Sequence, residues 1–492
     1  MTQNPADISM ETLWSQASSA YYAGEMGKAA QLGKQILQSD PNHAEALHMI
    51  GMIAKDFGQS EKALELVSQA VMINPNNGYF HHSLGLILLG QNRLDAAAER
   101  FKASLELKPD LASAITNLGS IAFRKNDYRT AVRYYQQSLQ ADPNQPTIHY
   151  NLGIIFQEFG QHDSALKFFQ QAIDRNPNYI DAFMGRAFSQ LMTQDFANGW
   201  QTYEWRWKLP HMVPRNYKQP KWDGIARPGE TLFIFAEQGF GDAIQFGRYL
   251  PQLRKMGHKV IFECQKPLVK LFESSDMADE IVIGDHKNPC NPQFDRYAPL
   301  LSLPGLLNTR ADTIPADTPY FSPDPSRIAF WKTELARYPG LKVGINWSGD
   351  PTAPANHGRA CNLADLHPLL TQPGVSFFSL QKGMPTESIK DLPAELTLHD
   401  LDAQLTDFTE TAAVLSNLDL LISTDTAVVH LAGALHRPVW TILHTSSEWR
   451  WQRERTDSPW YPSMTLFRQK LPWNWKDPVN AIAKHLSQRV TG

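Results

Sequence analysis

The sequence predicts an α-helical solenoid over residues 1–208, followed by an α/β fold of two lobes. The solenoid is predicted from five prolines at a strict 34-residue interval: Pro41, Pro75, Pro109, Pro143 and Pro177. The α/β fold is predicted because short apolar runs alternate with helical stretches beyond residue 230. Such alternation is typical of parallel sheets with crossover helices.

Each repeat reads as a helical hairpin. Alanine keeps the same interval from Ala29 to Ala165, and glycine keeps it from Gly51 to Gly153. These small residues allow the two helices of a unit to approach closely, and proline ends the second helix because it lacks an amide donor. One hairpin cannot bury both of its faces, so the units stack. We expect repeats at 10–43, 44–77, 78–111, 112–145 and 146–179, the first of them degenerate.

A sixth, imperfect unit and a connector follow the repeats. Residues 180–208 contain four aromatic side chains that we expect to cap the solenoid: Trp200, Tyr203, Trp205 and Trp207. Prolines interrupt any helix between residues 209 and 229, which predicts a stiff connector.

A 34-residue unit with Leu-Gly early, a small residue near its middle and Pro at its end resembles the tetratricopeptide repeat. Asn117 and Asn151 occupy equivalent places before the Leu-Gly pairs, on the concave surface. An amide offers a donor and an acceptor, so it can bind the backbone of an extended peptide. The protein O-GlcNAc transferases, which this part resembles, use an Asn ladder in this way. Met49 and Ser83 occupy the corresponding earlier places, so the ladder is short; solvated helix residues are the alternative.

Composition favours protein or small-molecule partners. The formal net charge of −4 over 492 residues gives no electrostatic reason to bind nucleic acid. The three cysteines are scattered, which suggests neither a disulfide framework nor a zinc site. We expect a cytoplasmic protein without membrane insertion, because we find no signal peptide and no apolar stretch near the ~18 residues that span a bilayer. The oligomeric state is left open.

The α/β part divides into a lobe at 230–325 and a lobe at 326–492. In the first lobe, strands are expected at 231–236 and 259–264, with a helix at 242–256 between them. Strands of the second lobe are expected at 341–347, 375–380, 418–423 and 438–443. Parallel sheets bind ligands beyond the carboxyl ends of their strands, so functional residues are sought in the loops that follow.

The loop after the first strand contains Gly239, Gly241 and Asp242. The glycines permit a close approach by a ligand. Asp242 opens the next helix, where a carboxylate is stabilised by free amides, so a helix cap is the alternative to a ligand-facing role. The loop lacks the G-x-G-x-x-G pattern of dinucleotide sites and is not a phosphate-binding P-loop.

A second candidate site follows the strand at 418–423. It comprises Thr424, Asp425, Thr426, Ala427 and His430. Small residues at a strand-to-helix junction leave backbone amides directed at whatever lies above the helix, which suits a phosphate. Ordinary helix caps and a packed histidine are the alternatives.

The run from Ser423 to Ala434, with Arg437-Pro438-Val439 behind it, resembles the donor-site motif of the heptosyltransferase-like GT-B glycosyltransferases. Gly241-Asp242 resembles the acceptor-lobe motif of the same family, whose aspartate is the proposed general base. The resemblance implies two Rossmann-like lobes and an inverting, metal-independent transfer. Ala427 stands where heptosyltransferases commonly carry glycine, so ADP-heptose is in doubt as the donor.

The resemblance also implies the parts of a nucleotide-sugar site. Asp242 would accept the proton of an acceptor hydroxyl, and the amides at 426–428 would stabilise the departing phosphate. Lys382 is our first choice for an assisting cation and Arg359 the second, each with a surface charge as the alternative. Trp347, Ser348 and Gln381 end or follow neighbouring strands and are assigned to the donor site. The aromatic clusters at 448–451 and 458–461 either stack on a sugar or pack between the lobes.

Repeats joined to such a domain are similar to a bacterial group of protein glycosyltransferases that includes flagellin-modifying enzymes. We therefore expect transfer of a sugar to Ser or Thr of a protein recruited by the repeats, flagellin being one such protein. Transfer to lipopolysaccharide or another glycan, and a non-catalytic scaffold that binds nucleotide sugars, are the alternatives. No cofactor or metal is expected, and CMP-, ADP-, UDP- and GDP-linked donors all stay open.

Overall fold

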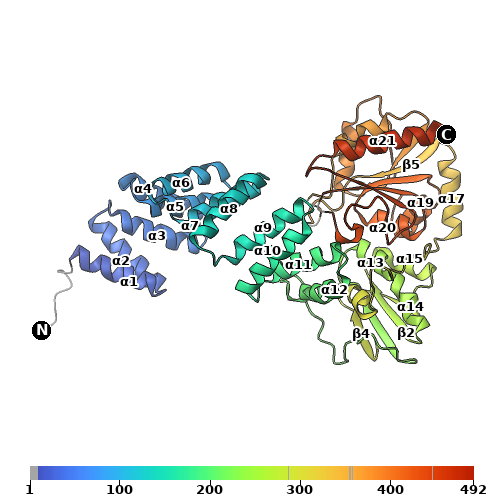
Figure 1. Cartoon of the computed structure of the whole chain (residues 1–492), viewed down its shortest axis with the longest axis horizontal. Coiled ribbons are helices and arrows are strands. Elements are labelled where there is room, and N and C mark those ends of the chain that lie inside the picture. The colour runs from blue at the N-terminus through green and yellow to red at the C-terminus, as the bar shows by residue number, and fades with distance from the viewer. Residues whose placement is uncertain (1–8, 286–287, 354–355, 357, 446, 492) are drawn as a thin grey trace. The chain divides into compact units, whose positions relative to one another are not determined.

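The computed structural model describes residues 9–285, 288–353, 356, 358–445 and 447–491 (Figure 1). The chain forms two compact units, Met1–Ile155 and Phe156–Gly492. The boundary falls inside α9 (Pro146–Glu158), the first helix of the fifth predicted repeat. None of the described helices has both the length and the apolar character needed to cross a membrane.

The first unit consists of helices paired as antiparallel hairpins, and each hairpin coincides with one predicted repeat. The second helix of each hairpin ends two residues before a repeated proline, as α4 does at Ile73 before Pro75. The bounds are α1 Met10–Tyr22, α2 Met26–Ser39, α3 Ala44–Asp56, α4 Ser60–Ile73, α5 Gly78–Gly90, α6 Leu94–Leu107, α7 Ala112–Arg124 and α8 Tyr128–Ala141.

Glycine in the first helix of a hairpin makes room for a large side chain in the second. A Cβ atom on Gly85 would lie 2.7 Å from Cε1 of Phe101, and one on Gly119 would lie 2.7 Å from the ring of Tyr135. Both rings are fully buried. The hairpins α5/α6 and α7/α8 are therefore closed by the same contact between a glycine and an aromatic ring, and in α3/α4 Gly51 meets Val67 in the same way.

The second unit begins with the end of the helical array. Its helices are α10 (His162–Arg175), α11 (Ile180–Met192) and α12 (Phe196–Tyr203), continued by the 3₁₀ turn η1 (Glu204–Lys208). The Pro-rich segment that follows packs along the first sheet. Arg215 forms a buried ion pair with Glu263, and the backbone N–H of Trp222 donates to the carbonyl oxygen of Tyr297 at 2.8 Å.

The first sheet is parallel, with the strand order β3-β2-β1-β4. Two of its strands, β3 and β4, were not expected from the sequence. The bounds are β1 Thr231–Phe235, α13 Phe240–Phe246, η2 Gly247–Tyr249, α14 Leu250–Lys255, β2 Lys259–Cys264, η3 Lys266–Leu268, α15 Val269–Ser274, β3 Glu280–Ile283, β4 Arg296–Pro299, η4 Leu300–Ser302 and α16 Leu303–Leu306.

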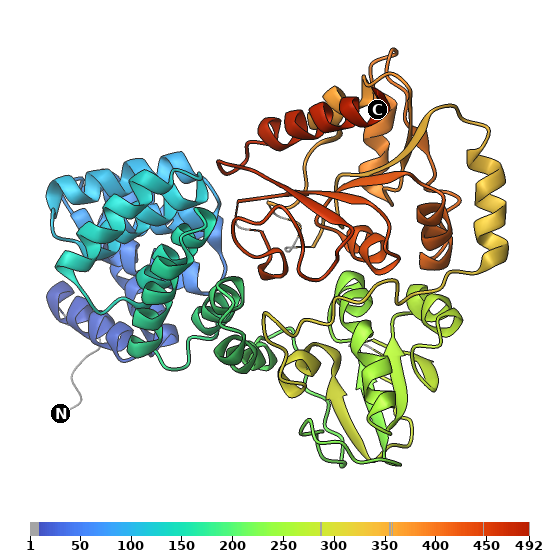
Figure 2. The same ribbon diagram turned by 45° about the vertical axis from the view of Figure 1, so that its right-hand side comes forward.

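The second sheet is also parallel, with the order β10-β9-β8-β5-β6-β7, so the chain reverses direction across the sheet between β5 and β8. Figure 2 shows both sheets from another side. The bounds are α17 Pro325–Leu335, β5 Leu341–Asn346, η6 Leu363–Leu366, α18 His367–Leu370, β6 Val375–Ser379, η7 Met384–Asp391, β7 His399–Asp400, α19 Phe408–Ser416, β8 Leu420–Thr424, α20 Ala427–Ala434, β9 Val439–Leu443, η8 Trp449–Trp451, β10 Met464–Arg468 and α21 Lys476–Thr491.

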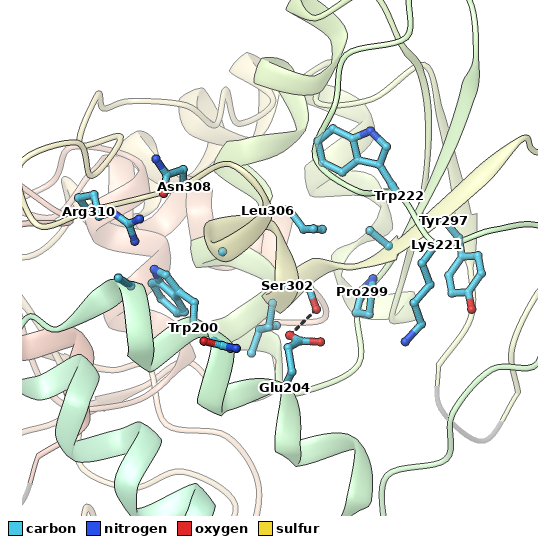
Figure 3. Close-up of a pocket in the computed structure, with 15 residues that line it drawn as sticks. Trp200, Glu204, Lys221, Trp222, Tyr297, Pro299, Ser302, Leu306, Asn308 and Arg310 are labelled. Atoms are coloured by element: carbon cyan, nitrogen blue, oxygen red, sulfur yellow. Dashed lines mark hydrogen bonds between the residues drawn. The ribbon is translucent and has the colours of Figure 1, made fainter. Parts of the chain in front are cut away.

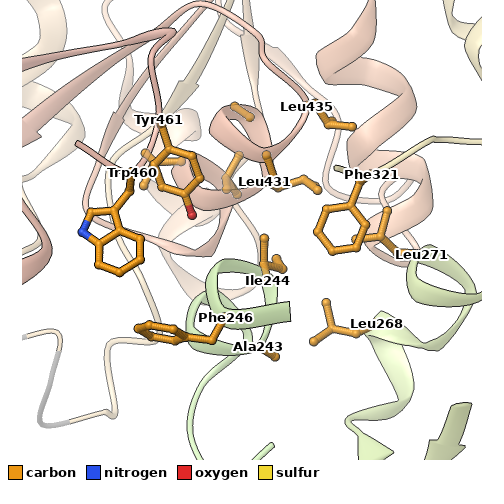
Figure 4. Packing of buried hydrophobic residues seen from close by; sticks show 14 of the residues in the cluster. Ala243, Ile244, Phe246, Leu268, Leu271, Phe321, Leu431, Leu435, Trp460 and Tyr461 are labelled. Atoms are coloured by element: carbon orange, nitrogen blue, oxygen red, sulfur yellow. The ribbon is translucent and has the colours of Figure 1, made fainter. Parts of the chain in front are cut away.

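One hydrophobic core runs through both lobes of this unit. It joins Ile244 of α13 to Leu431 of α20, and the rings of Phe246 and Trp460 lie beside them (Figure 4). All four side chains are at most 1% exposed. Burial of this much apolar surface fixes α13 against α20 and brings the loops around them together.

We predict that Gly85→Ala destabilises the first unit, whereas Gly90→Ala does not. The new methyl group at residue 85 would press on the buried ring of Phe101, and overpacking of this kind costs about 1–3 kcal/mol. A methyl group on Gly90, in the same helix, would meet no atom within 4 Å, so alanine there should gain up to ~1 kcal/mol from helix propensity. Urea unfolding of the full chain measures both, and equal stabilities for the two variants would contradict the packing argument.

Candidate functional site

Two cavities open beside each other where the loops of the two lobes face one another. One has a volume of about 410 Å³ and a polar lining that includes Asp242, Arg359, Asp425, His430, Glu448 and Arg450. The other has a volume of about 570 Å³ and lies over the carboxyl ends of β5, β6 and β8. They share Phe240, Gly349, Asp350, Thr426 and Ala427, so they form one continuous site.

Asp242 lies in the first turn of α13 and faces the polar cavity. Its Oδ2 accepts the backbone N–H of Gly239 at 3.0 Å, which is the helix-cap contact. Its Oδ1 forms an ion pair with Arg450 of η8. The side chain is 19% exposed, so the carboxylate caps the helix and is accessible to a ligand at the same time.

Gly241 permits the close approach of α13 to α20. A Cβ atom here would lie 2.9 Å from Cδ2 of His430 and 3.5 Å from Cα of Ala427. The lobes therefore meet at the predicted glycine loop, and any side chain at residue 241 would separate Asp242 from the start of α20.

Arg450 was missed as a site residue because its sequence context is a cluster of aromatic residues. Its side chain is 6% exposed and bridges two carboxylates, Asp242 of the first lobe and Glu448. Burial raises the pKa of Glu448, and the charge of Arg450 opposes this shift. The neighbouring rings are almost fully buried, so they pack between elements and do not line the site: Trp449, Trp451, Trp460 and Tyr461.

The start of α20 is held by β5. Thr426 is the N-cap residue in an extended conformation, and its Oγ1 donates to Oδ1 of Asn346 at 3.1 Å. Thr426 and Ala427 line both cavities, whereas Thr424 is fully buried below them. Asn346, at the end of β5, was not identified from the sequence.

Asp425 and His430 form a buried pair beside the polar cavity. Asp425 lies 3.5 Å from Nη1 of Arg359 and 3.8 Å from Nε2 of His430. Nδ1 of His430 lies 3.1 Å from the hydroxyl of Tyr461, and the imidazole stacks on Trp451. Burial lowers the pKa of His430 well below its ordinary value, and nearby arginines act in the same direction. His430 is therefore neutral near pH 7.

Gln381 lines the larger cavity but its amide binds protein groups, and Trp347 lines neither cavity. Oε1 of Gln381 accepts the backbone N–H groups of Trp347 and Ser348, and its Nε2 donates to the carbonyl oxygen of Ser348 at 2.9 Å. This amide ties the loop after β6 to the loop after β5. Trp347 is buried in the core on the other side of β5, whereas Ser348 lines the larger cavity. Lys382 also lines that cavity and is paired with Asp402.

The larger cavity combines apolar walls with a polar end. Phe240, Met384, Leu405 and Phe408 supply apolar surface, and Thr426 with Ala427 lies at the junction with the polar cavity. A planar aromatic ring fits such walls, and an anion fits the start of α20. Among the described residues, no three His, Cys, Asp or Glu side chains are grouped so as to hold a metal ion.

Asn117 and Asn151 belong to the first unit. Nδ2 of Asn117 lies 3.4 Å from Nε2 of His82, and Nδ2 of Asn151 donates to the hydroxyl of Tyr135 at 3.0 Å. Ser83, at the equivalent place of an earlier repeat, lies 2.8 Å from Nε2 of His48. These contacts orient the side chains along successive repeats.

Family models match the helical repeats and a region of the second lobe. Tetratricopeptide repeat families match residues 20–87 and 110–178. Glycosyltransferase family 9 (heptosyltransferase) matches residues 363–478, which include the start of α20, Lys382 and Arg450.

Protein FlbA of Caulobacter vibrioides (strain ATCC 19089 / CIP 103742 / CB 15) is 29% identical over 319 residues, which are 58% of this chain and 52% of FlbA. The chain thus spans about half the length of this curated relative. Among solved structures, MamA from Desulfovibrio magneticus RS-1 is similar at 18% identity, with a TM-score of 0.32, over 35% of this chain and 96% of MamA. PilF of Pseudomonas aeruginosa is similar at 16% identity, with a TM-score of 0.37, over 42% and 93%.

The α/β part carries loops of both lobes around one cavity, and the helical part carries the 34-residue period. The chain therefore carries tetratricopeptide repeats in its helical part and, at residues 363–478, a region of a glycosyltransferase family 9 (heptosyltransferase) domain.

Proposed function

We propose that this chain is an inverting glycosyltransferase of the GT-B type, which transfers a sugar from a nucleotide sugar to Ser or Thr hydroxyls of an acceptor protein. One observation carries the proposal: Asp242 of the first lobe and the start of α20 in the second line the same cavity. A base and an anion-binding helix start are the two parts that such a transfer needs.

The donor is assigned to the second lobe. The first backbone N–H groups of α20 have no acceptor within the helix, and the helix dipole favours a negative group there. The diphosphate of the donor would lie at Thr426 and Ala427, with Arg359 and Arg450 in the same cavity as counter-charges. The nucleobase of the donor would occupy the apolar cavity near Phe408. The reversal of strand order between β5 and β8 lies beneath this position, where doubly wound sheets bind ligands.

The chemistry would be a single displacement. The acceptor oxygen forms a bond to the anomeric carbon while the bond from this carbon to the phosphate oxygen breaks. The electron pair of the broken bond leaves with the phosphate, and Asp242 takes the hydroxyl proton. One displacement inverts the configuration of the anomeric carbon. The start of α20 and the arginines stabilise the departing charge without a metal ion.

The acceptor is assigned to the repeats. Stacked hairpins present an extended concave surface, and Asn117 and Asn151 are oriented on it by neighbouring repeats. We propose that these amides hold an extended peptide through its backbone.

We predict that Asp242→Asn lowers transfer about 10²–10⁴-fold, because asparagine keeps the shape of the side chain but cannot accept the proton. The assay follows the mass of acceptor proteins and of glycan acceptors incubated with the full chain and CMP-, ADP-, UDP- or GDP-linked sugars. Asp365→Asn is a matched control, because Asp365 occupies the same cap position and accepts the N–H of Asn362 at 2.9 Å, away from both cavities.

A mass increment on the glycan but not on the protein would contradict the protein acceptor. Nucleotide binding with no increment on either would favour a scaffold. Unchanged transfer by Asp242→Asn would remove the base assignment.

We predict that one of the four nucleotides CMP, ADP, UDP and GDP raises the melting temperature of the chain most. Arg359→Met and Lys382→Met should each weaken the binding of that nucleotide about 10-fold. A hydrogen bond to a charged group is worth ~1.5–3 kcal/mol. Thermal shift against nucleotide concentration measures this, since stabilisation rises with the ratio of ligand concentration to Kd. Lys390→Met is the control, because Lys390 is exposed on η7 and lines neither cavity. Equal nucleotide binding by the wild type and all three variants would contradict the assignment of both cations to the donor site.

A further inference from the structure

The ligand crevice of the first sheet is occupied by a residue of the helical array. In this sheet the strand order reverses between β1 and β4, which is where a doubly wound sheet binds its ligand. Arg206 of η1 enters at this point and is 1% exposed. Its Nη2 donates to Oε1 of Glu237 at 2.9 Å and to Oγ of Ser302 at 2.8 Å. Glu237 follows β1 and Ser302 follows β4, so one guanidinium joins both loops.

A second contact reaches the loop that carries Asp242. Nε2 of Gln238 donates to the hydroxyl of Tyr203 at 3.0 Å. Burial raises the pKa of Tyr203 well above its ordinary value, so the phenol stays neutral. Gln238 precedes Gly239, whose N–H donates to Asp242. The array thus holds two consecutive residues of the loop, Glu237 and Gln238, directly before this helix cap.

The last hairpin of the array, formed by α11, α12 and η1, also contacts the loop that carries Arg450. Trp200 packs edge-to-face on Trp449, with 5.2 Å between ring centroids. Nε2 of Gln194 donates to Oε1 of Gln452 at 3.1 Å. Trp449 directly precedes Arg450 in the chain, and Gln452 follows it by two residues. The hairpin of α11, α12 and η1 therefore bridges the two loops whose side chains, Asp242 and Arg450, form the ion pair of the site.

The contact of the hairpin with the first lobe continues around a separate cavity of about 290 Å³ (Figure 3). There Ser302 donates to Glu204 at 2.8 Å, and Glu204 is also paired with Arg206. Nε1 of Trp200 donates to the carbonyl oxygen of Thr309 at 3.0 Å. Arg206 is thus held by charged and polar partners on both of its sides.

We propose that residues 180–208 act as a clamp that sets the position of Asp242 relative to Arg450, with Arg206 as its principal positioning residue. The catalytic part of this inference rests on the proposed role of Asp242 as the base. A base must lie within hydrogen-bond reach of the proton that it removes, and a misplacement of about 1 Å can cost ~10²-fold in rate. Residues 180–208, the sixth hairpin, therefore position the catalytic groups, whereas the repeats of the first unit recruit the acceptor protein.

The chain provides a matched control for Arg206. Arg215 is also a buried arginine paired with a buried glutamate, Glu263, at the end of the neighbouring strand β2. Arg215 and Glu237 line the same small cavity, but the hydrogen bonds of Arg215 go to Tyr217, Glu263 and Asp285, which lie outside the loop at 237–242 and outside η8. Loss of either arginine leaves a buried carboxylate uncompensated and destabilises the chain.

The test is hydrogen exchange of the full chain, with Arg206→Met compared with Arg215→Met. The clamp requires that amides at 237–242 and 448–452 exchange at least about 10-fold faster in Arg206→Met, and that they stay within about twofold of wild type in Arg215→Met. Unchanged exchange at these loops in Arg206→Met, or the same increase in both variants, overturns the proposal. This readout needs no donor or acceptor, so it decides the clamp even if the wild-type chain transfers no sugar.

Kinetics then separate positioning from stability. Arg206→Met should lower kcat at least about 10-fold and raise the Kd of the nucleotide by a smaller factor, because Arg206 bonds to Glu237 and Ser302 of the first lobe, whereas Arg359 and the start of α20 still face the donor. The double variant Arg206→Met with Glu237→Gln removes the uncompensated charge and should recover melting temperature but not kcat. Recovery of kcat together with stability would show that Arg206 acts only on folding and would overturn its positioning role.

Discussion

The packing of α13 against α20 is the contact on which the site depends. It brings the two lobes together through one apolar core, in which Ile244 and Leu431 are fully buried. Gly241 makes the approach close enough for the first turn of α13 to reach the first turn of α20. Two helix starts then open into one cavity: the first turn of α13, which bears Asp242, and the start of α20, which Asp425 precedes. Asp242 and Glu448 line this cavity together, and the buried guanidinium of Arg450 pairs with both carboxylates.

Much of the fold could be predicted because its signals are local and periodic. The 34-residue interval located the hairpins to within a few residues, since each period ends at a proline and the second, third and fourth periods carry a glycine that packs against a side chain of the second helix. The strands β1 and β2 were predicted because they are continuous apolar runs. The strand β4 contains a proline and β7 has only two residues, so neither carries a readable pattern.

The site could be predicted only in part, because sequence places a residue after a strand but does not say which way it points. Asp242, Thr426 and Ala427 face a shared cavity. Gln381 and Trp347 follow neighbouring strands, yet Gln381 lines the larger cavity with its amide bound to backbone groups, and Trp347 enters the core. The pairing of Asp242 with Arg450 joins residues 208 positions apart and leaves no local signal.

The helical array contributes in two physically different ways. Its first unit keeps regular hairpins whose polar side chains, such as Asn117, contact residues of the preceding repeat. Its last hairpin replaces that regularity with Trp200, Tyr203 and Arg206, which insert into the lobes. Aromatic rings and a buried guanidinium give a rigid, specific joint, because their hydrogen bonds can be made in only one arrangement.

The central claim is that the start of α20 and Asp242 enclose a donor diphosphate between them. A crystal structure of the full chain with the best-binding nucleoside diphosphate tests it most directly. The account predicts a phosphate oxygen about 2.7–3.2 Å from the backbone amides at 427–428, on the side of the cavity that faces Asp242. A nucleotide bound elsewhere, or bound with its phosphates directed away from α20, would contradict it.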